Sequence, residues 1–174
     1  MKINYRPEID GLRAIAVFSV ITYHARDTFL PGGFLGVDIF FVISGYLITS
    51  LILKELKLTN KFSFSNFYER RVRRIIPALL GMIILSTFIS YITLLPDSFV
   101  DFSKSLISSI FSVSNFYFLY TGNLYGAESS LLKPLLHTWS LSVEEQFYLI
   151  WPIVIFYFYS RKLTVIALIL FSLG

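Results

Sequence analysis

Long apolar runs alternate with short polar segments along this chain of 174 residues. Four of the runs have close to the about 20 residues that a helix needs to cross a bilayer: residues 9–25, 35–53, 75–95 and 139–160. A run at residues 105–120 is shorter and richer in serine, and another begins at residue 163. The pattern predicts an all-α fold, a polytopic transmembrane helix bundle with about five to six helices present.

Composition supports a membrane protein and excludes several other classes. The chain is 55% hydrophobic and only 15% charged, whereas about a quarter of the residues of a soluble domain are charged. It contains no cysteine, which excludes a disulfide framework, a thiolate metal site and a cysteine nucleophile. Two histidines far apart in sequence predict no metal site. The net charge is +4 and the basic residues collect in one connector, so no nucleic-acid partner is expected.

That basic connector, residues 54–74, predicts the orientation of the chain. Positive charge favours the cytoplasmic side of a membrane, so the connector and, two helices earlier, the N-terminus are expected in the cytoplasm. Counting further crossings then places Arg161 and Lys162 outside, against the same rule. We therefore expect that the run at residues 105–120 does not fully cross or re-enters the membrane.

An arginine and a histidine lie on the first predicted helix. Arg13 and His24 are eleven residues apart, about three turns, so they share a face and lie about 16 Å apart along the axis. With Arg13 at the cytoplasmic boundary, His24 lies past the middle of a hydrocarbon core about 30 Å thick. In one interpretation Arg13 holds an anionic group and His24 transfers protons or activates a nucleophile. The alternative is an interfacial histidine with an anchoring arginine.

Arginines gather directly before the run at residues 75–95. Arg71 and Arg74 are three residues apart, so on a helix they share a face. Guanidinium groups suit phosphate oxygens better than lysine does, which makes this face a candidate clamp for the phosphates of a nucleotide-containing donor. Topology anchoring or contact with anionic lipids is the alternative.

Two adjacent glutamates, Glu144 and Glu145, lie within the run at residues 139–160. A carboxylate in the membrane is costly unless it faces a wet cavity or a cationic partner. A glutamate that faces His24 would orient the imidazole and stabilise its cation, as the acid does in a Ser-His-Asp arrangement.

Residues just before the glutamates allow a structural alternative. Thr138 or Ser140 is a candidate helix cap, and acidic residues are favoured at a helix N-terminus. His137 precedes Glu144 by seven residues and would share its face.

A glycine-rich segment precedes the second run. Gly32, Gly33 and Gly36 permit a tight turn and a close approach between helices. Asp38, two residues further along, is another candidate for a buried acid.

Four stretches, in this order, resemble the acyltransferase 3 family of integral membrane O-acyltransferases: RPEIDGLRAIAVFSVITYHA, GGFLGVDIFFVISGYLIT, FYERRVRRIIPALL and HTWSLSVEEQFYLIWP. The first carries the family's Arg-(ten residues)-His signature at Arg13 and His24, and the third carries its Arg-x-x-Arg signature at Arg71 and Arg74. The resemblance spans nearly the whole chain and rests on several linked motifs.

The resemblance implies acyl transfer from acyl-CoA, usually acetyl-CoA, which is a substrate on the cytoplasmic side and not a permanently bound cofactor. The implied acceptor is a hydroxyl of a carbohydrate such as lipopolysaccharide O-antigen, peptidoglycan or an exopolysaccharide, or of a secondary metabolite. The implied site divides into ligands for the donor phosphates (Arg13, Arg71 and Arg74), a general base (His24), acids that support it (Glu144 and Glu145) and further support (Asp38 and His137).

The family also implies a setting for the chain: a multi-pass domain of about ten helices in the bacterial cytoplasmic (inner) membrane. Residues 1–174 are then expected to be the N-terminal part of one acyltransferase 3 domain, cut within a helix. The expected partners are the lipid bilayer and the C-terminal half of the same protein, on which activity is expected to depend.

Two other classes place ionisable groups in membrane helices. A transporter or flippase would move its substrate without consuming acyl-CoA, and internal repeats, which we do not find here, would favour it. A non-catalytic membrane scaffold or sensor would tolerate substitution of His24 and of the arginine face.

Overall fold

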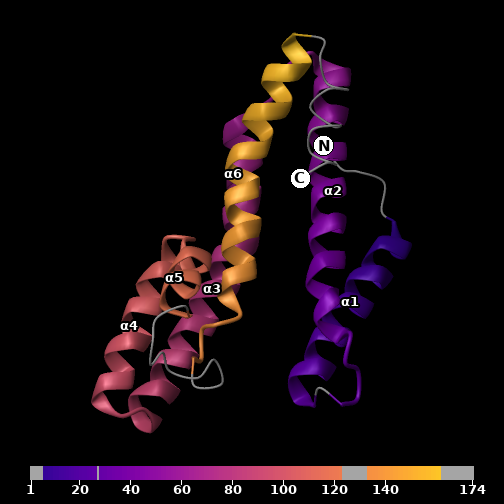
Figure 1. The fold of residues 1–174 in the computed structure, drawn as a ribbon. Coiled ribbons are helices and arrows are strands. Elements are labelled where there is room, and N and C mark those ends of the chain that lie inside the picture. Colours follow the sequence, from indigo (N-terminus) through magenta and orange to yellow (C-terminus); the bar gives the residue numbers. More distant parts are fainter. Residues whose placement is uncertain (1–5, 27, 123–132, 162–174) are drawn as a thin grey trace. The chain divides into compact units, whose positions relative to one another are not determined.

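The computed structural model describes residues 6–26, 28–122 and 133–161. This part of the chain consists of helices and contains no strand (Figure 1), which confirms the all-α prediction. The elements are α1 (Pro7–Ala25), the 3₁₀ helix η1 (Gly33–Leu35), α2 (Gly36–Thr59), α3 (Phe64–Thr93), α4 (Pro96–Ile110), α5 (Ser114–Gly122) and α6 (Thr138–Ser160). They form two compact units, residues 1–62 with 148–174 and residues 63–147.

Among the described helices, two are long and apolar enough to cross a bilayer: residues 33–59 and α3, with mean hydropathies of 2.0 and 2.2. Helices α1 and α6 lie close to the predicted runs, and their crossing of the membrane stays a prediction. The run that begins at residue 163 lies outside the described residues.

The basic connector is mostly helical, which differs from the prediction of a separate polar segment. Helix α2 ends at Thr59 and is capped by Asn60, whose φ of 52° is left-handed, a conformation that asparagine tolerates at a helix end. Helix α3 begins only four residues later, because the Ser63 side chain caps it by accepting a hydrogen bond from the Asn66 amide (3.4 Å). The arginines before residue 75 therefore lie on α3 itself.

The serine-rich run at residues 105–120 forms two helices instead of one. Helix α4 ends at Ile110, α5 begins at Ser114, and Ser112 between them has a left-handed φ of 56°. We call residues 111–113 the corner. With 15 residues in α4 and 9 in α5, the two helices are about 22 and about 14 Å long. Neither alone reaches across a hydrocarbon core of about 30 Å.

The C-terminal part of α4 carries its polar and apolar residues in the reverse of the usual order, whereas its N-terminal part buries Phe102 and exposes Asp101 and Lys104. Ser105, Ser108 and Ser109 are buried, whereas Ile107 and Ile110 are exposed, at 57% and 48%. A helix on the surface of a water-soluble protein buries its apolar face instead. Serine inside and isoleucine outside is the order expected where the surroundings are lipid, because lipid tails are as apolar as the side chains themselves.

In the other unit, α1 and α2 form an antiparallel hairpin with a very close contact at its turn (Figure 1). A Cβ atom added at Gly36 would lie 2.3 Å from the Ala16 carbonyl oxygen, and one at Gly33 would lie 2.4 Å from that of Ser19. The predicted close approach is thus confirmed for these two glycines. A Cβ at Gly32 would meet only the Leu35 side chain, at 4.0 Å.

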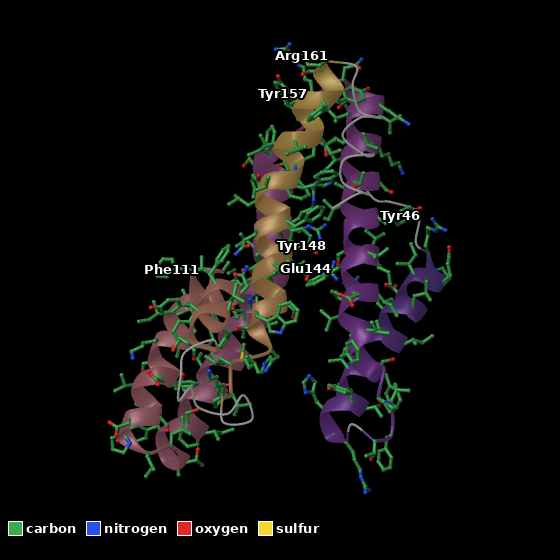
Figure 2. The ribbon with its side chains drawn as sticks, in the orientation of Figure 1. Tyr46, Phe111, Glu144, Tyr148, Tyr157 and Arg161 are labelled. Atoms are coloured by element: carbon green, nitrogen blue, oxygen red, sulfur yellow. The ribbon has the colours of Figure 1, made fainter. Side chains whose placement is uncertain are left out.

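Two polar contacts tie further residues to α2 within the same unit. At the open end of the hairpin, the Arg6 guanidinium donates a hydrogen bond to the Tyr46 hydroxyl (2.8 Å; Tyr46 is labelled in Figure 2). Farther along α2, the Trp151 indole of α6 donates to the Thr49 hydroxyl (2.8 Å), next to the fully buried Ile52 and Ile155.

The close contact predicts opposite effects of the same substitution at two helical glycines. In the full-length protein, Gly36→Ala should lower the midpoint of thermal unfolding in mild detergent, because the new methyl group must displace the α1 backbone, at a cost of about 1–3 kcal/mol. The matched control is Gly81→Ala in α3, where no atom lies within 4 Å of the added Cβ and alanine is the better helix former. An unchanged midpoint for Gly36→Ala would contradict the contact.

Candidate functional site

Arg13 and His24 lie on one unbroken helix, α1, so the predicted separation of about 16 Å along its axis holds. The Arg13 guanidinium lies over the Phe40 ring of α2, 4.9 Å from the ring centroid, and its side chain is half-buried. A cation above an aromatic face is attracted by the ring quadrupole. Arg13 is therefore positioned by the α1–α2 hairpin.

His24 lies in the last turn of α1, where the helix dipole favours a cation, and its side chain is exposed. The Tyr23 ring meets the imidazole edge-on, with 5.5 Å between centroids, and meets Phe34 edge-on at 5.8 Å. Because His24 and Glu144 belong to different units, their pairing stays a prediction.

Asp38 is the third residue of α2, and its side chain is exposed in this hairpin instead of buried. An acid in the first turn of a helix is favoured by the helix dipole. This position gives Asp38 a structural explanation, while its role as a supporting acid stays a prediction.

Arg71 and Arg74 lie one turn apart on α3, as the spacing predicts. The Arg71 guanidinium is 5.6 Å from the centroid of the Phe67 ring, and Phe67 is fully buried. Between them in sequence, Arg73 forms an ion pair with Glu69 (2.7 Å) that is largely exposed and contributes little stability. Arg71 thus shares with Arg13 a guanidinium placed over a phenylalanine ring.

The two glutamates do not lie at a helix N-terminus. Glu144 and Glu145 are the seventh and eighth residues of α6, so the structural alternative based on the helix dipole is wrong. Thr138 is the first helical residue, and its hydroxyl lies in a buried polar cluster instead of capping the helix. His137 directly precedes the helix, so the predicted shared face with Glu144 is not that of two helical residues.

Glu145 and its neighbour Gln146 contact the corner between α4 and α5. The Ser112 hydroxyl donates a hydrogen bond to the Glu145 carboxylate. The Gln146 amide donates to the Ser112 carbonyl oxygen (2.7 Å) and to the Asn115 side-chain oxygen (2.9 Å), and the Asn115 amide donates back to Gln146 (3.2 Å). The corner is therefore held by two adjacent side chains of α6.

A chain of buried hydroxyl groups continues from this contact. Oxygen–oxygen distances are 2.8 Å from Ser109 to Thr138, 3.0 Å from Thr138 to Ser114 and 2.8 Å from Ser114 to Ser142. All four residues are at most 3% exposed. Each hydroxyl both donates and accepts, so the chain links α4, α5 and α6 without leaving these groups unpaired.

This network was not predicted from the sequence, although two signals point to it. Serine is frequent in the run at residues 105–120, and polar residues repeat along one stripe of α6, at positions 138, 142, 145 and 146. That spacing of four, three and one places them on one side of a helix.

The family described as Acyltransferase domain matches the chain over residues 6–174. The chain is similar to the O-acetyltransferase OatA of Staphylococcus aureus strain NCTC 8325 / PS 47, with 45% identity over 161 residues. The protein of that name in strain COL matches equally well. These matches cover 91% of the chain and 26% of the relatives, so the chain spans about a quarter of their length. No solved structure matches the chain.

The hydroxyl chain predicts that a single oxygen atom at its centre is needed for stability. Ser114→Ala in the full-length protein removes the two buried hydrogen bonds that join Thr138 to Ser142 through the Ser114 hydroxyl, and each such bond contributes about 0.5–1.5 kcal/mol. The midpoint of thermal unfolding in detergent should fall. Ser65→Ala, at an exposed position in the first turn of α3, is the control and should leave it unchanged.

Proposed function

The chain belongs to the acyltransferase family whose domain it matches over residues 6–174, and from this we propose that it is part of a membrane-bound O-acyltransferase. The enzyme would move an acyl group, most simply acetyl, from acyl-CoA to a hydroxyl of a cell-surface carbohydrate. The names of the relatives, O-acetyltransferases at 45% identity, support the acetyl group. Acetyl-CoA is a substrate in this proposal, and no permanently bound cofactor is needed.

The observation that supports the proposal best is the placement of Arg13 and His24 on one helix. Arg13 is half-buried over Phe40, and His24 is exposed about three turns further along. A CoA thioester has the same two parts, since its phosphates are anionic and its reactive carbonyl lies at the far end of a long arm. One helix would thus meet both parts of the donor.

Arg71 and Arg74 would share the donor phosphates with Arg13. A guanidinium that lies over a ring keeps its N–H edges available for phosphate oxygens. Phe40 and Phe67 would therefore hold Arg13 and Arg71 in place without competing for the ligand.

His24 would act as the general base. The acceptor hydroxyl gives its proton to His24, its oxygen bonds to the thioester carbonyl carbon, and the carbon–sulfur bond breaks. The same proton then passes from His24 to the CoA thiolate. Of the two predicted acids, we assign Glu144 to the histidine, because Glu145 is already engaged by Ser112. Asp38 and His137 stay predicted supporting residues.

We also propose how the chain crosses the bacterial cytoplasmic membrane. With the N-terminus in the cytoplasm, α3 leads outwards, α4 and α5 dip in and return to the same side, and α6 leads back. Arg161 and Lys162 then lie in the cytoplasm, in agreement with the positive-inside rule. Lys104 and Asp101 form an exposed ion pair on α4 (2.7 Å), in agreement with contact between this part of α4 and water.

The proposed reaction predicts separate effects for the base and the phosphate ligands. In membranes containing the full-length protein, His24→Ala should lower kcat for acetyl transfer from acetyl-CoA by about 10²-fold or more, the usual contribution of a general base. Arg71→Ala should mainly raise the KM for acetyl-CoA, because it removes a ligand of the donor and not a reacting group.

Arg73→Ala is the matched control for the arginine, because Arg73 is paired with Glu69 and exposed. It should change neither constant. Wild-type transfer rates in His24→Ala and Arg71→Ala, at equal protein levels, would overturn the assignment, and substrate movement without acyl-CoA consumption would favour a transporter.

The proposed path predicts which side of the membrane two positions face. Residues 1–174 contain no cysteine, so no other thiol of this part of the chain competes when single cysteines are introduced at Lys104 and Ser160 of the full-length protein, with the unsubstituted protein as the labelling control. In intact cells, a membrane-impermeant maleimide should label Lys104→Cys, and it should label Ser160→Cys only after permeabilisation. Labelling of Ser160→Cys from outside would contradict the path.

A further inference from the structure

We propose that the adjacent glutamates have different tasks, and that Glu145 with Gln146 is a positioning pair that locks the α4–α5 corner onto α6. The Glu145 carboxylate accepts a hydrogen bond from Ser112, and the negative charge of Glu145 takes no part in the reaction. This inference rests on the proposed function in one respect, which is the assignment of Glu144 as the acid that supports His24.

Helical geometry separates the two side chains. Successive residues of an α-helix are about 100° apart around its axis. Glu145 and Gln146 point to the side that also carries Thr138 and Ser142, and all four of these residues contact α4, α5 or the corner between them. Glu144 lies about 100° further round, outside this stripe. Figure 2 labels Glu144 on α6 and Phe111 at the corner.

The corner needs such a lock because its backbone is both strained and interrupted. Ser112 has a φ of 56°, and a left-handed conformation costs a non-glycine residue about 1–2 kcal/mol. Such residues persist where their surroundings hold them in place. Here the hydroxyl of Ser112 is bound by Glu145 and its carbonyl oxygen by Gln146.

The apolar surroundings make these bonds hard to replace. Phe111 next to Ser112 is 73% exposed, and Ile107 and Ile110 are also exposed, so the outside of the corner is apolar. Non-helical backbone at membrane depth is tolerated only where protein satisfies its polar groups. Without Glu145 and Gln146, both Ser112 groups would lose partners that lipid cannot supply.

A neutral side chain of the same shape tests the inference. In the full-length protein, Glu145→Gln keeps an oxygen that accepts from Ser112, so only a small part of the strength of one hydrogen bond is lost. Transfer from acetyl-CoA should therefore stay within about twofold of wild type. Glu144→Gln is the matched control and should lose about tenfold or more, because it removes the charge that supports His24.

A double-mutant cycle in thermal unfolding tests the contact itself. Glu145→Ala and Ser112→Ala should each lower the unfolding midpoint in mild detergent by about 3 °C. The double variant should be no worse than the poorer single variant, because the two changes remove the same hydrogen bond.

Two results would overturn the inference. One is loss of transfer in Glu145→Gln as large as in Glu144→Gln with a wild-type midpoint, which would mean that the reaction uses the charge of Glu145. The other is a strictly additive or absent effect on the midpoint in the double-mutant cycle. If the wild-type protein transfers no acyl group at all, the proposed function fails, while the unfolding cycle still decides whether Glu145 holds the corner.

Discussion

The hydrogen bonds between α6 and the α4–α5 corner are the constraint on which the second unit depends. The outside of the corner is apolar, so the polar groups of its backbone must find partners inside the protein. Four buried hydroxyls and the side chains of Glu145 and Gln146 supply them. The same requirement explains why α4 buries serine and exposes isoleucine, and why a break in the helix is compatible with an otherwise apolar run.

In the first unit, α1 is held to η1 and α2 by direct backbone contact instead of side-chain hydrogen bonds. In lipid, no hydrophobic effect drives helices together. Van der Waals packing between closely spaced backbones favours their association instead. The glycines at positions 33 and 36 let η1 and α2 touch the backbone of α1 directly. That contact fixes the rotation of α1, and with it the place of Arg13 over Phe40. These two glycines thus help to determine where Arg13, a candidate for binding the donor phosphates, lies.

Much of the helical pattern could be predicted from the sequence, because apolar runs of span length have few alternatives. The start of α3 was missed because the cap at Ser63 lies within a basic segment that otherwise suggests a connector. The division of residues 105–120 was missed because no proline marks it. It depends on a left-handed serine stabilised by residues more than 30 positions away. Among site residues, the shared helix of Arg13 and His24 followed from spacing, whereas Phe40 and Phe67 beneath the arginines required tertiary contacts.

The broken run also bears on the conflict between charge and the number of crossings. A chain with five full crossings before Arg161 would expose two basic residues outside, against the positive-inside rule. Two helices of about 22 and about 14 Å are too short to cross singly, and the corner between them is polar only on the side that faces α6. In the proposed path, which has one crossing fewer, the end of α6 lies in the cytoplasm. Arg161 lies over the Tyr157 ring, 5.3 Å from its centroid (Figure 2), an aromatic and basic pair of the kind that anchors helix ends at a membrane surface. Helix length, face polarity and charge therefore agree on one path, and each was derived from different residues.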